Sequence, residues 1–155
     1  MFLVAVEIYM SNTNKKITNA ILISFIRILD GVSKKKIPQK ISYAITKNFI
    51  NLSKEYECYE TELNKIFDEY SKYFILDDNG NKTLDENGIP IVNDNIKNDY
   101  YTSLNNLLNL DIEVSIYTID DKYFDYDDLD GRYDVLSPME IIQLQSILCK
   151  DDTNE

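Results

Sequence analysis

The chain has 155 residues, 44% of them hydrophobic and 28% charged, which is the balance of a single globular domain. It contains no histidine, so Ser-His-Asp and Cys-His catalysis and imidazole metal ligation are excluded. The net charge of −11 is uneven: residues 1–50 hold eight basic and two acidic residues, and residues 51–155 hold eight basic and 25 acidic. This acidic body disfavours nucleic acid as a general partner, because that affinity depends on neutralising phosphates.

The N-terminus begins with an alternating apolar segment. This alternation predicts a strand over residues 2–10, with a buried face made of Phe2, Val4, Val6, Ile8 and Met10. Glu7 interrupts the apolar run and no basic residue precedes it, so we interpret the segment as a strand and not as a signal peptide. No run of about 18 apolar residues predicts a membrane span, and we expect a cytoplasmic protein.

Two helices are predicted next. Apolar steps of three and four from Ile17 to Ile28 predict a helix over residues 13–29, capped by Thr13 or Asn14 and ended by Asp30-Gly31. The same spacing continues from Ile41 to Tyr70 and predicts a long helix over residues 38–74, which Pro38 begins.

The long helix would measure about 55 Å if it were unbroken. That is long for a domain of this size, so it either bends near residues 51–53 or projects beyond the body. Its apolar seam either packs against the other helices of the chain or forms a dimeric coiled coil. A homodimer through this helix therefore stays open at this point.

The second half of the chain alternates turns, helices and one strand. Asn79-Gly80 and Asn87-Gly88 predict an exposed hairpin or loop over residues 77–94. Periodic apolar residues predict a helix over residues 94–108, and alternation predicts a strand over residues 111–119 that pairs with the first strand.

The last helix, residues 138–149, has a clear start. Ser137 is predicted to be its N-cap, with Pro138 at the first position and Glu140 completing a capping box. Its main face would hold Met139, Ile142, Gln143, Ser146 and Ile147, with Leu144 and Leu148 flanking it. We expect residues 151–155 to fray. The elements predict one α+β domain over residues 1–155, in which a small antiparallel sheet packs on helices and the long helix is the spine.

An acidic aromatic loop is predicted over residues 120–136. Its spacing does not fit a calcium-binding EF-hand, because placing Gly131 at position 6 puts Tyr126 at position 1 and Ser137 at position 12. The simplest interpretation is a solvated loop; the sharper one is a contact surface for a basic protein, with aspartates imitating phosphates. The candidate partner-binding residues, which include two tyrosines of the long helix, are Asp120, Asp121, Tyr123, Phe124, Asp125, Tyr126, Asp127, Asp128, Asp130, Tyr133, Tyr70 and Tyr73.

One short segment carries most of the positive charge. Such a cluster at a helix start suits an anion or a nucleotide, or it neutralises the acidic half of the same chain. The candidate anion-binding residues are Lys34, Lys35, Lys36, Lys40 and Arg27. We predict no catalytic residue, cofactor or metal, since the chain has no glycine-rich phosphate loop and no nucleophile motif.

Four segments carry a resemblance to a known family. They are the N-terminal strand and helix, the end of the long helix (Tyr56-Glu57-Cys58-Tyr59-Glu60 through Phe67-Asp68-Glu69-Tyr70), the turns from Asp78-Asn79-Gly80 to Asp85-Glu86-Asn87-Gly88, and the stretch from Tyr101-Thr102-Ser103-Leu104 to Ile112-Glu113-Val114. Over roughly residues 1–115 the chain resembles an uncharacterised family of small proteins from phages and prophages of low-GC Gram-positive bacteria. No catalytic motif defines that family, so no functional residue carries over. The resemblance implies a phage accessory protein, for which counter-defence is a common role.

These inferences favour one function and leave two others open. We expect a non-enzymatic phage protein that binds and inhibits a host protein with a basic surface, such as an immune effector, in the cytoplasm of the infected bacterium. This anti-CRISPR-like role needs neither direct nucleic-acid binding nor a membrane. The first alternative is a sponge for an immune nucleotide signal, and the second is a virion or assembly component that oligomerises through the long helix.

Overall fold

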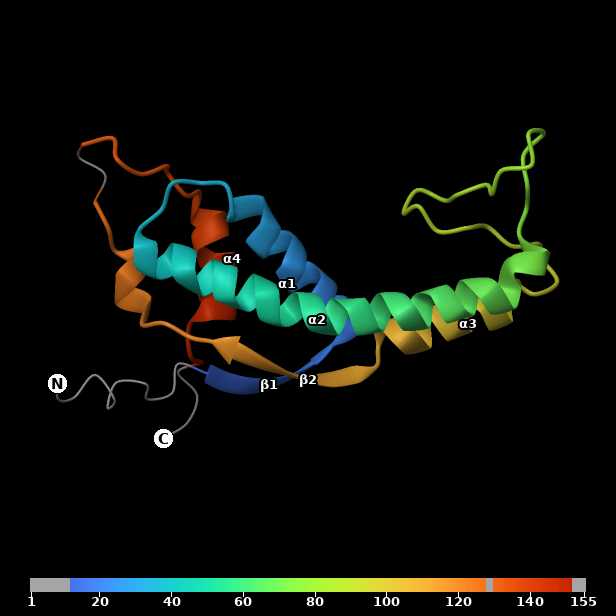
Figure 1. Ribbon diagram of the computed structural model, residues 1–155, viewed down its shortest axis with the longest axis horizontal. Coiled ribbons are helices and arrows are strands. Elements are labelled where there is room, and N and C mark those ends of the chain that lie inside the picture. The colour runs from blue at the N-terminus through green and yellow to red at the C-terminus, as the bar shows by residue number, and fades with distance from the viewer. Residues whose placement is uncertain (1–11, 128–129, 152–155) are drawn as a thin grey trace, which may run out of the picture.

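The computed structural model describes residues 12–127 and 130–151. In these residues the chain forms a two-stranded antiparallel sheet and four α-helices, so the α+β prediction is confirmed. The elements in chain order are β1 (Asn12–Thr18), α1 (Asn19–Val32), α2 (Gln39–Tyr70), α3 (Lys97–Leu108), β2 (Asp111–Tyr117) and α4 (Pro138–Leu148). Figure 1 shows α2 running along almost the whole length of the molecule.

The sheet uses a different first strand from the predicted one. β1 pairs with β2 along the full length of both strands. Residues 13–18 were predicted to begin a helix, and that prediction is wrong. Within β1 the exposed and partly buried side chains alternate up to Ile17, and this period of two is the pattern of a strand. The predicted strand over residues 2–10 lies outside the described residues.

The first helix is shifted along the chain relative to its prediction. Thr18, and not Thr13 or Asn14, is the N-cap of α1, and its hydroxyl accepts a hydrogen bond from the N–H of Ile21 at 3.3 Å. The helix also continues through Gly31 to Val32, past the predicted end. Val32 is buried in the main core. This packing explains why the helix continues past Gly31, although glycine is a weak helix former and was expected to end it.

The long helix is confirmed and is continuous. α2 covers 32 residues and continues into a short 3-10 helix, Ser71–Tyr73. Leu52, inside the segment where a bend was considered, is fully buried and helical. Only the first half of α2 packs on α1 and the sheet, and the second half projects beyond them together with α3 (Figure 1).

The buried residues form two separate cores. The main core joins α1, the first half of α2, the sheet and α4, and its fully buried members include Leu22, Leu29, Ile41, Ile45, Leu52, Ile116, Leu144, Ile147 and Leu148. The second core lies between the end of α2, α3 and the loop that joins them, and it is built on Tyr70, Phe74, Val92, Tyr100 and Leu104. We call the second half of α2, α3 and the 74–92 loop the distal end.

The 74–92 loop is a closed structure with an eight-residue repeat. Ile75, Thr83 and Ile91 form a ring of three backbone hydrogen bonds, in which each N–H donates to the next carbonyl at 2.9 Å. Between these residues the chain makes two similar turns, started by Asp77 and Asp85. Each turn includes a glycine in the left-handed region, with φ of 80° at Gly80 and 76° at Gly88.

The last helix begins as predicted but buries a different face. The capping box is confirmed: the Ser137 hydroxyl accepts from the N–H of Glu140, and the Glu140 carboxylate accepts from the N–H of Ser137. The predicted main face is wrong at Met139 and Ile142, which are 62% and 60% exposed. α4 instead meets the main core along the line of Leu144, Ile147 and Leu148.

Candidate functional site

The acidic aromatic loop turns most of its aromatic rings inward. Phe124 is buried in the main core, and Tyr126 packs partly against the same core. The rings of Tyr126 and Tyr133 meet edge to face at 5.6 Å. Tyr123 is the exposed ring of this group, and it lies under the ammonium group of Lys40 at 5.5 Å. The rings therefore fix the loop on the body more than they offer contact area.

The aspartates of this loop stay at the surface, and one of them holds the basic segment. The exposed ones are Asp120, Asp121, Asp125, Asp127, Asp130 and Asp134, whereas Asp128 lies outside the described residues. The backbone N–H of Lys122 donates to Asp120 and holds the pKa of that carboxyl below its usual value. Asp134 accepts from the backbone N–H of Lys36 at 2.6 Å and donates its own N–H to the Lys36 carbonyl at 2.7 Å.

The five candidate anion-binding residues do not converge on one site. Lys35 forms an ion pair of 2.6 Å with Glu140, which lies in the acidic half of the chain. Lys36 and Lys40 contact the acidic loop as described above, and Lys34 is exposed. Arg27 is exposed on α1 near Tyr59, whose pKa is raised by burial and by Tyr56 and is lowered by the Arg27 charge.

The pair between Glu140 and Lys35 makes stability depend on pH. The hydrogen bond from Lys35 lowers the pKa of Glu140, and the N–H of Ser137 lowers it further. A carboxyl whose pKa is lower in the folded state stabilises the fold above its unfolded pKa of about 4.3 and loses this effect as pH falls through the folded value. We therefore expect Glu140→Gln to lower the melting temperature at pH 7 and the difference to vanish below pH of about 3.

The control for this prediction is Glu86→Gln, which removes an exposed carboxylate that forms no ion pair within the described residues. Its melting curve should follow that of the wild type at both pH values. A Glu140→Gln protein that is equally destabilised at low and neutral pH would contradict the assignment, since the loss would then not come from the charge.

The two tyrosines of the long helix are part of the distal core. The hydroxyl of Tyr70 lies 3.4 Å from that of Ser103, and its ring packs on Tyr100 at 5.2 Å. Tyr73 is partly buried beside them, with the Lys72 ammonium 5.0 Å from its ring. Tyr100 is fully buried and donates its hydroxyl to the Pro90 carbonyl at 2.8 Å, and burial raises its pKa to about 12.

The distal end has exposed apolar residues that the sequence analysis did not single out. Leu76 and Leu84 occupy equivalent positions of the eight-residue repeat and are 57% and 52% exposed, and Ile75 beside them is also exposed. They alternate with carboxylates at the two turns. At the first turn the N–H groups of Asn81 and Asn79 donate to Asp77 and lower its pKa, so this charge is fixed by the turn itself. The signal was present in the sequence as Leu-Asp-x-Asn-Gly occurring twice.

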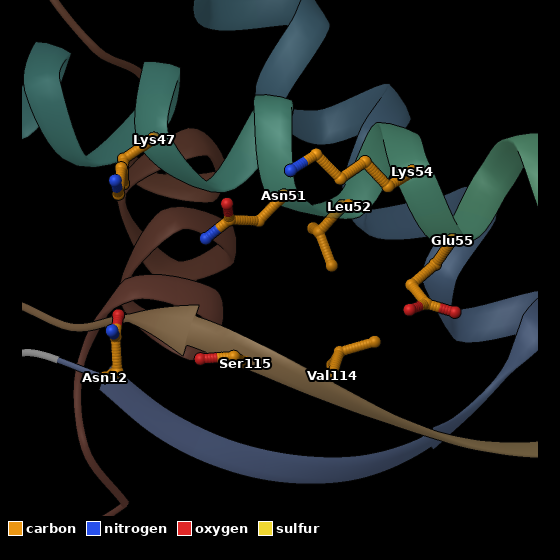
Figure 2. Close-up of a pocket in the computed structure, with 8 residues that line it drawn as sticks. All are labelled: Asn12, Lys47, Asn51, Leu52, Lys54, Glu55, Val114 and Ser115. Carbon is orange, nitrogen blue, oxygen red and sulfur yellow. The ribbon is translucent and has the colours of Figure 1, made fainter.

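A groove of about 360 Å³ lies between α2 and β2 on the main body. Figure 2 shows its lining, with Lys47, Asn51 and Glu55 pointing from α2 toward the strands and Lys54 lying along the helix. Its floor is formed by the buried side chains Leu52 and Val114, and its strand side by Asn12 and Ser115. This groove could not be predicted from the sequence, because only the fold brings these two stretches of chain together.

The described part of the chain lacks two other features that would indicate a function. Within residues 12–127 and 130–151, no three His, Cys, Asp or Glu side chains gather as ligands for a metal ion. No helix in the same residues combines the length and apolar character needed to cross a membrane. Comparisons with protein-family models, curated proteins and solved structures found no match to the chain.

Proposed function

We propose that this protein is a non-enzymatic binding protein that acts by covering a surface of another protein with its distal end. The observation that carries the proposal is the use of half of a 32-residue helix to hold a small closed loop away from the main core (Figure 1). Apart from Tyr56, which packs against the main core, the projecting part forms a core of its own, and this favours a role for the surface that it presents.

The distal end is rigid, which favours binding. The three hydrogen bonds among Ile75, Thr83 and Ile91 close the loop, and the bond from Tyr100 to Pro90 fixes it on α3. A loop held in one conformation loses little entropy when a partner covers it. Exposed leucines on such a surface are the type of side chain that a protein partner buries.

The charge of the distal end indicates the kind of partner. Residues 55–108 contain twelve acidic and four basic residues, a net charge of −8. Carboxylates around an apolar centre favour a partner with a basic rim, because complementary charge speeds encounter and sets orientation. The resemblance to phage-encoded proteins makes a host protein the expected partner and inhibition the expected result.

The acidic aromatic loop lies on a different surface from the distal end. It lies beside the start of α2, next to Lys40, whereas Tyr70 and Tyr73 lie at the far end of that helix (Figure 1). A helix of 32 residues is about 48 Å long. A standard interface of about 800 Å² per partner is only about 30 Å across, so one such interface does not reach both ends. We therefore assign the main contact to the distal end.

The test replaces the two exposed leucines. We expect the double variant Leu76→Asp/Leu84→Asp to bind the partner about a hundredfold more weakly, because each change places a charge in a desolvated apolar contact. The full-length protein would be immobilised to capture its partner from host lysate, and the affinity would then be measured with the purified partner.

The matched control is Ile50→Asp, which adds one such charge at an equally exposed apolar position on the main body. This variant should keep the affinity of the wild type. If Ile50→Asp abolished binding and the double leucine variant did not, the contact would lie on the main body and the assignment to the distal end would be wrong.

A further inference from the structure

The groove between α2 and β2 exposes the edge of a strand. The fully buried side chain of Asn48 donates to the Tyr117 carbonyl at 2.8 Å and accepts from the Tyr117 N–H at 2.7 Å. Both backbone groups of Tyr117 thus point away from β1 and toward α2. In an antiparallel pair this direction recurs at every second residue, so the backbone groups of Ser115 point the same way.

At Ser115 the helix provides no substitute for a neighbouring strand. α2 satisfies the β2 edge at Tyr117 through Asn48, but one turn later the groove opens in front of Ser115. Among the described residues no side chain of α2 donates to or accepts from the Ser115 backbone. The groove therefore meets both the backbone N–H and the backbone carbonyl of Ser115 at this edge, and the Ser115 side chain is also part of the lining of the space of about 360 Å³.

The side chains above this edge divide the groove into two ends of opposite charge. Lys47 and Lys54 form no ion pair within the described part of the chain, although the protein carries a net charge of −11. In Figure 2 the Lys54 side chain extends away from Glu55 and toward Asn51, so the ammonium groups lie on one side and the carboxylate on the other. Two unpaired lysines, a backbone N–H and a hydroxyl form the donor set of a phosphate site.

The remaining lining suits the body of a small molecule. Leu52 and Val114 give an apolar floor, and Asn12 and Asn51 offer amide groups on either side. The Glu55 carboxylate is an acceptor for hydroxyl groups, and it repels a second anionic group at its own end. A volume of about 360 Å³ lies at the lower limit of ligand sites, which excludes large ligands.

We propose that the groove binds a small phosphorylated compound with a hydroxyl-bearing body, of the size of a sugar phosphate or a mononucleotide. The phosphate group lies between Lys47, Lys54 and the N–H of Ser115, and the hydroxyl groups face Glu55. This site is on the main body, so it is independent of the contact assigned to the distal end.

The experiment is a titration of the full-length protein followed by ¹H–¹⁵N NMR. The probes are inorganic phosphate, ribose 5-phosphate and ribose. Both phosphates should shift the amide signals of Asn51, Lys54 and Ser115 in a saturable way, with ribose 5-phosphate binding about tenfold more tightly than phosphate, and ribose should not bind. Losing a hydrogen bond to a charged group lowers affinity by about tenfold or more. Lys47→Gln and Lys54→Gln should therefore each lower the affinity for phosphate and for ribose 5-phosphate by that factor.

Two further variants separate this site from general attraction of anions. Lys34→Gln removes the same charge from an exposed lysine outside the groove and should leave both affinities within about twofold. Glu55→Ala should reduce the advantage of ribose 5-phosphate over phosphate. The proposal is overturned if phosphate gives no saturable shift with a dissociation constant below about 10 mM, if ribose binds as well as its phosphate, or if Lys34→Gln matches the effect of Lys47→Gln.

Discussion

Replacing Asn48 by alanine is expected to lower the free energy of unfolding by about 3 kcal/mol or more. The Asn48 side chain is fully buried and makes three hydrogen bonds, one to the Ala44 carbonyl and two to the backbone of Tyr117. Alanine would leave the N–H and C=O of Tyr117 without partners. An unsatisfied buried group costs about 1–3 kcal/mol, so the two groups together account for the expected loss.

Urea unfolding monitored by circular dichroism would measure this effect. The matched control is Asn51→Ala, because Asn51 lies one turn further along α2 and its side chain makes no hydrogen bond within the described residues. We expect that variant to unfold within about 0.5 kcal/mol of the wild type. Equal losses in the two variants would show that Asn48 does not act through the strand edge.

The position of Asn48 also explains how a two-stranded sheet is kept in the fold. An isolated strand pair is only marginally stable, and its edges are open to further pairing. Here one helical side chain takes the place of a third strand at Tyr117, and α1 and α4 cover the sheet through the main core. Periodicity marked α2 as a helix, but it could not identify Asn48, because its role depends on a strand 69 residues away.

The sequence predicted the elements in which side-chain burial follows the backbone period. The apolar spacing of α2 holds from Ile41 to Tyr70, and the capping box at Ser137 specifies the start of α4 by local hydrogen bonds. β1 was missed because its residues are polar, and its conformation depends on pairing with β2 and not on its own apolar content. Elements with a strong local signal were therefore predicted correctly, whereas an element that depends on pairing with a distant segment was missed.

Two of the candidate binding residues are core residues, and a related reason explains why the sequence did not show this. Tyrosine is amphipathic, so its presence among charged residues does not tell whether the ring is exposed. Tyr70 and Phe124 were predicted to face a partner, yet both are buried, one in each core. Leu76 and Leu84 are the opposite case, because both are apolar and yet more than half exposed.

Replacing Tyr100 by alanine is expected to unfold the distal end while the main core remains folded. Tyr100 is fully buried at the centre of the distal core, and truncating a large buried aromatic residue costs about 3–5 kcal/mol. The two cores share no buried residue, so this loss should stay local. Hydrogen exchange read by mass spectrometry should show lost protection over residues 74–108 and retained protection in α1 and α4.

Two further variants distinguish the ring from its hydroxyl group and from a general effect. Tyr100→Phe removes only the hydrogen bond to Pro90 and should lower the free energy of unfolding by about 1 kcal/mol. The pKa of about 12 keeps the Tyr100 hydroxyl protonated, so this loss should be the same from pH 6 to about pH 9. Tyr43→Ala removes an exposed ring on the first half of α2 and should leave exchange in the distal end unchanged.

If Tyr100→Ala instead exposed the whole chain to exchange, the two cores would form one cooperative unit. The distal end would then be a continuation of the main fold and not a separately stabilised surface, and the reason for assigning the partner contact to it would be removed.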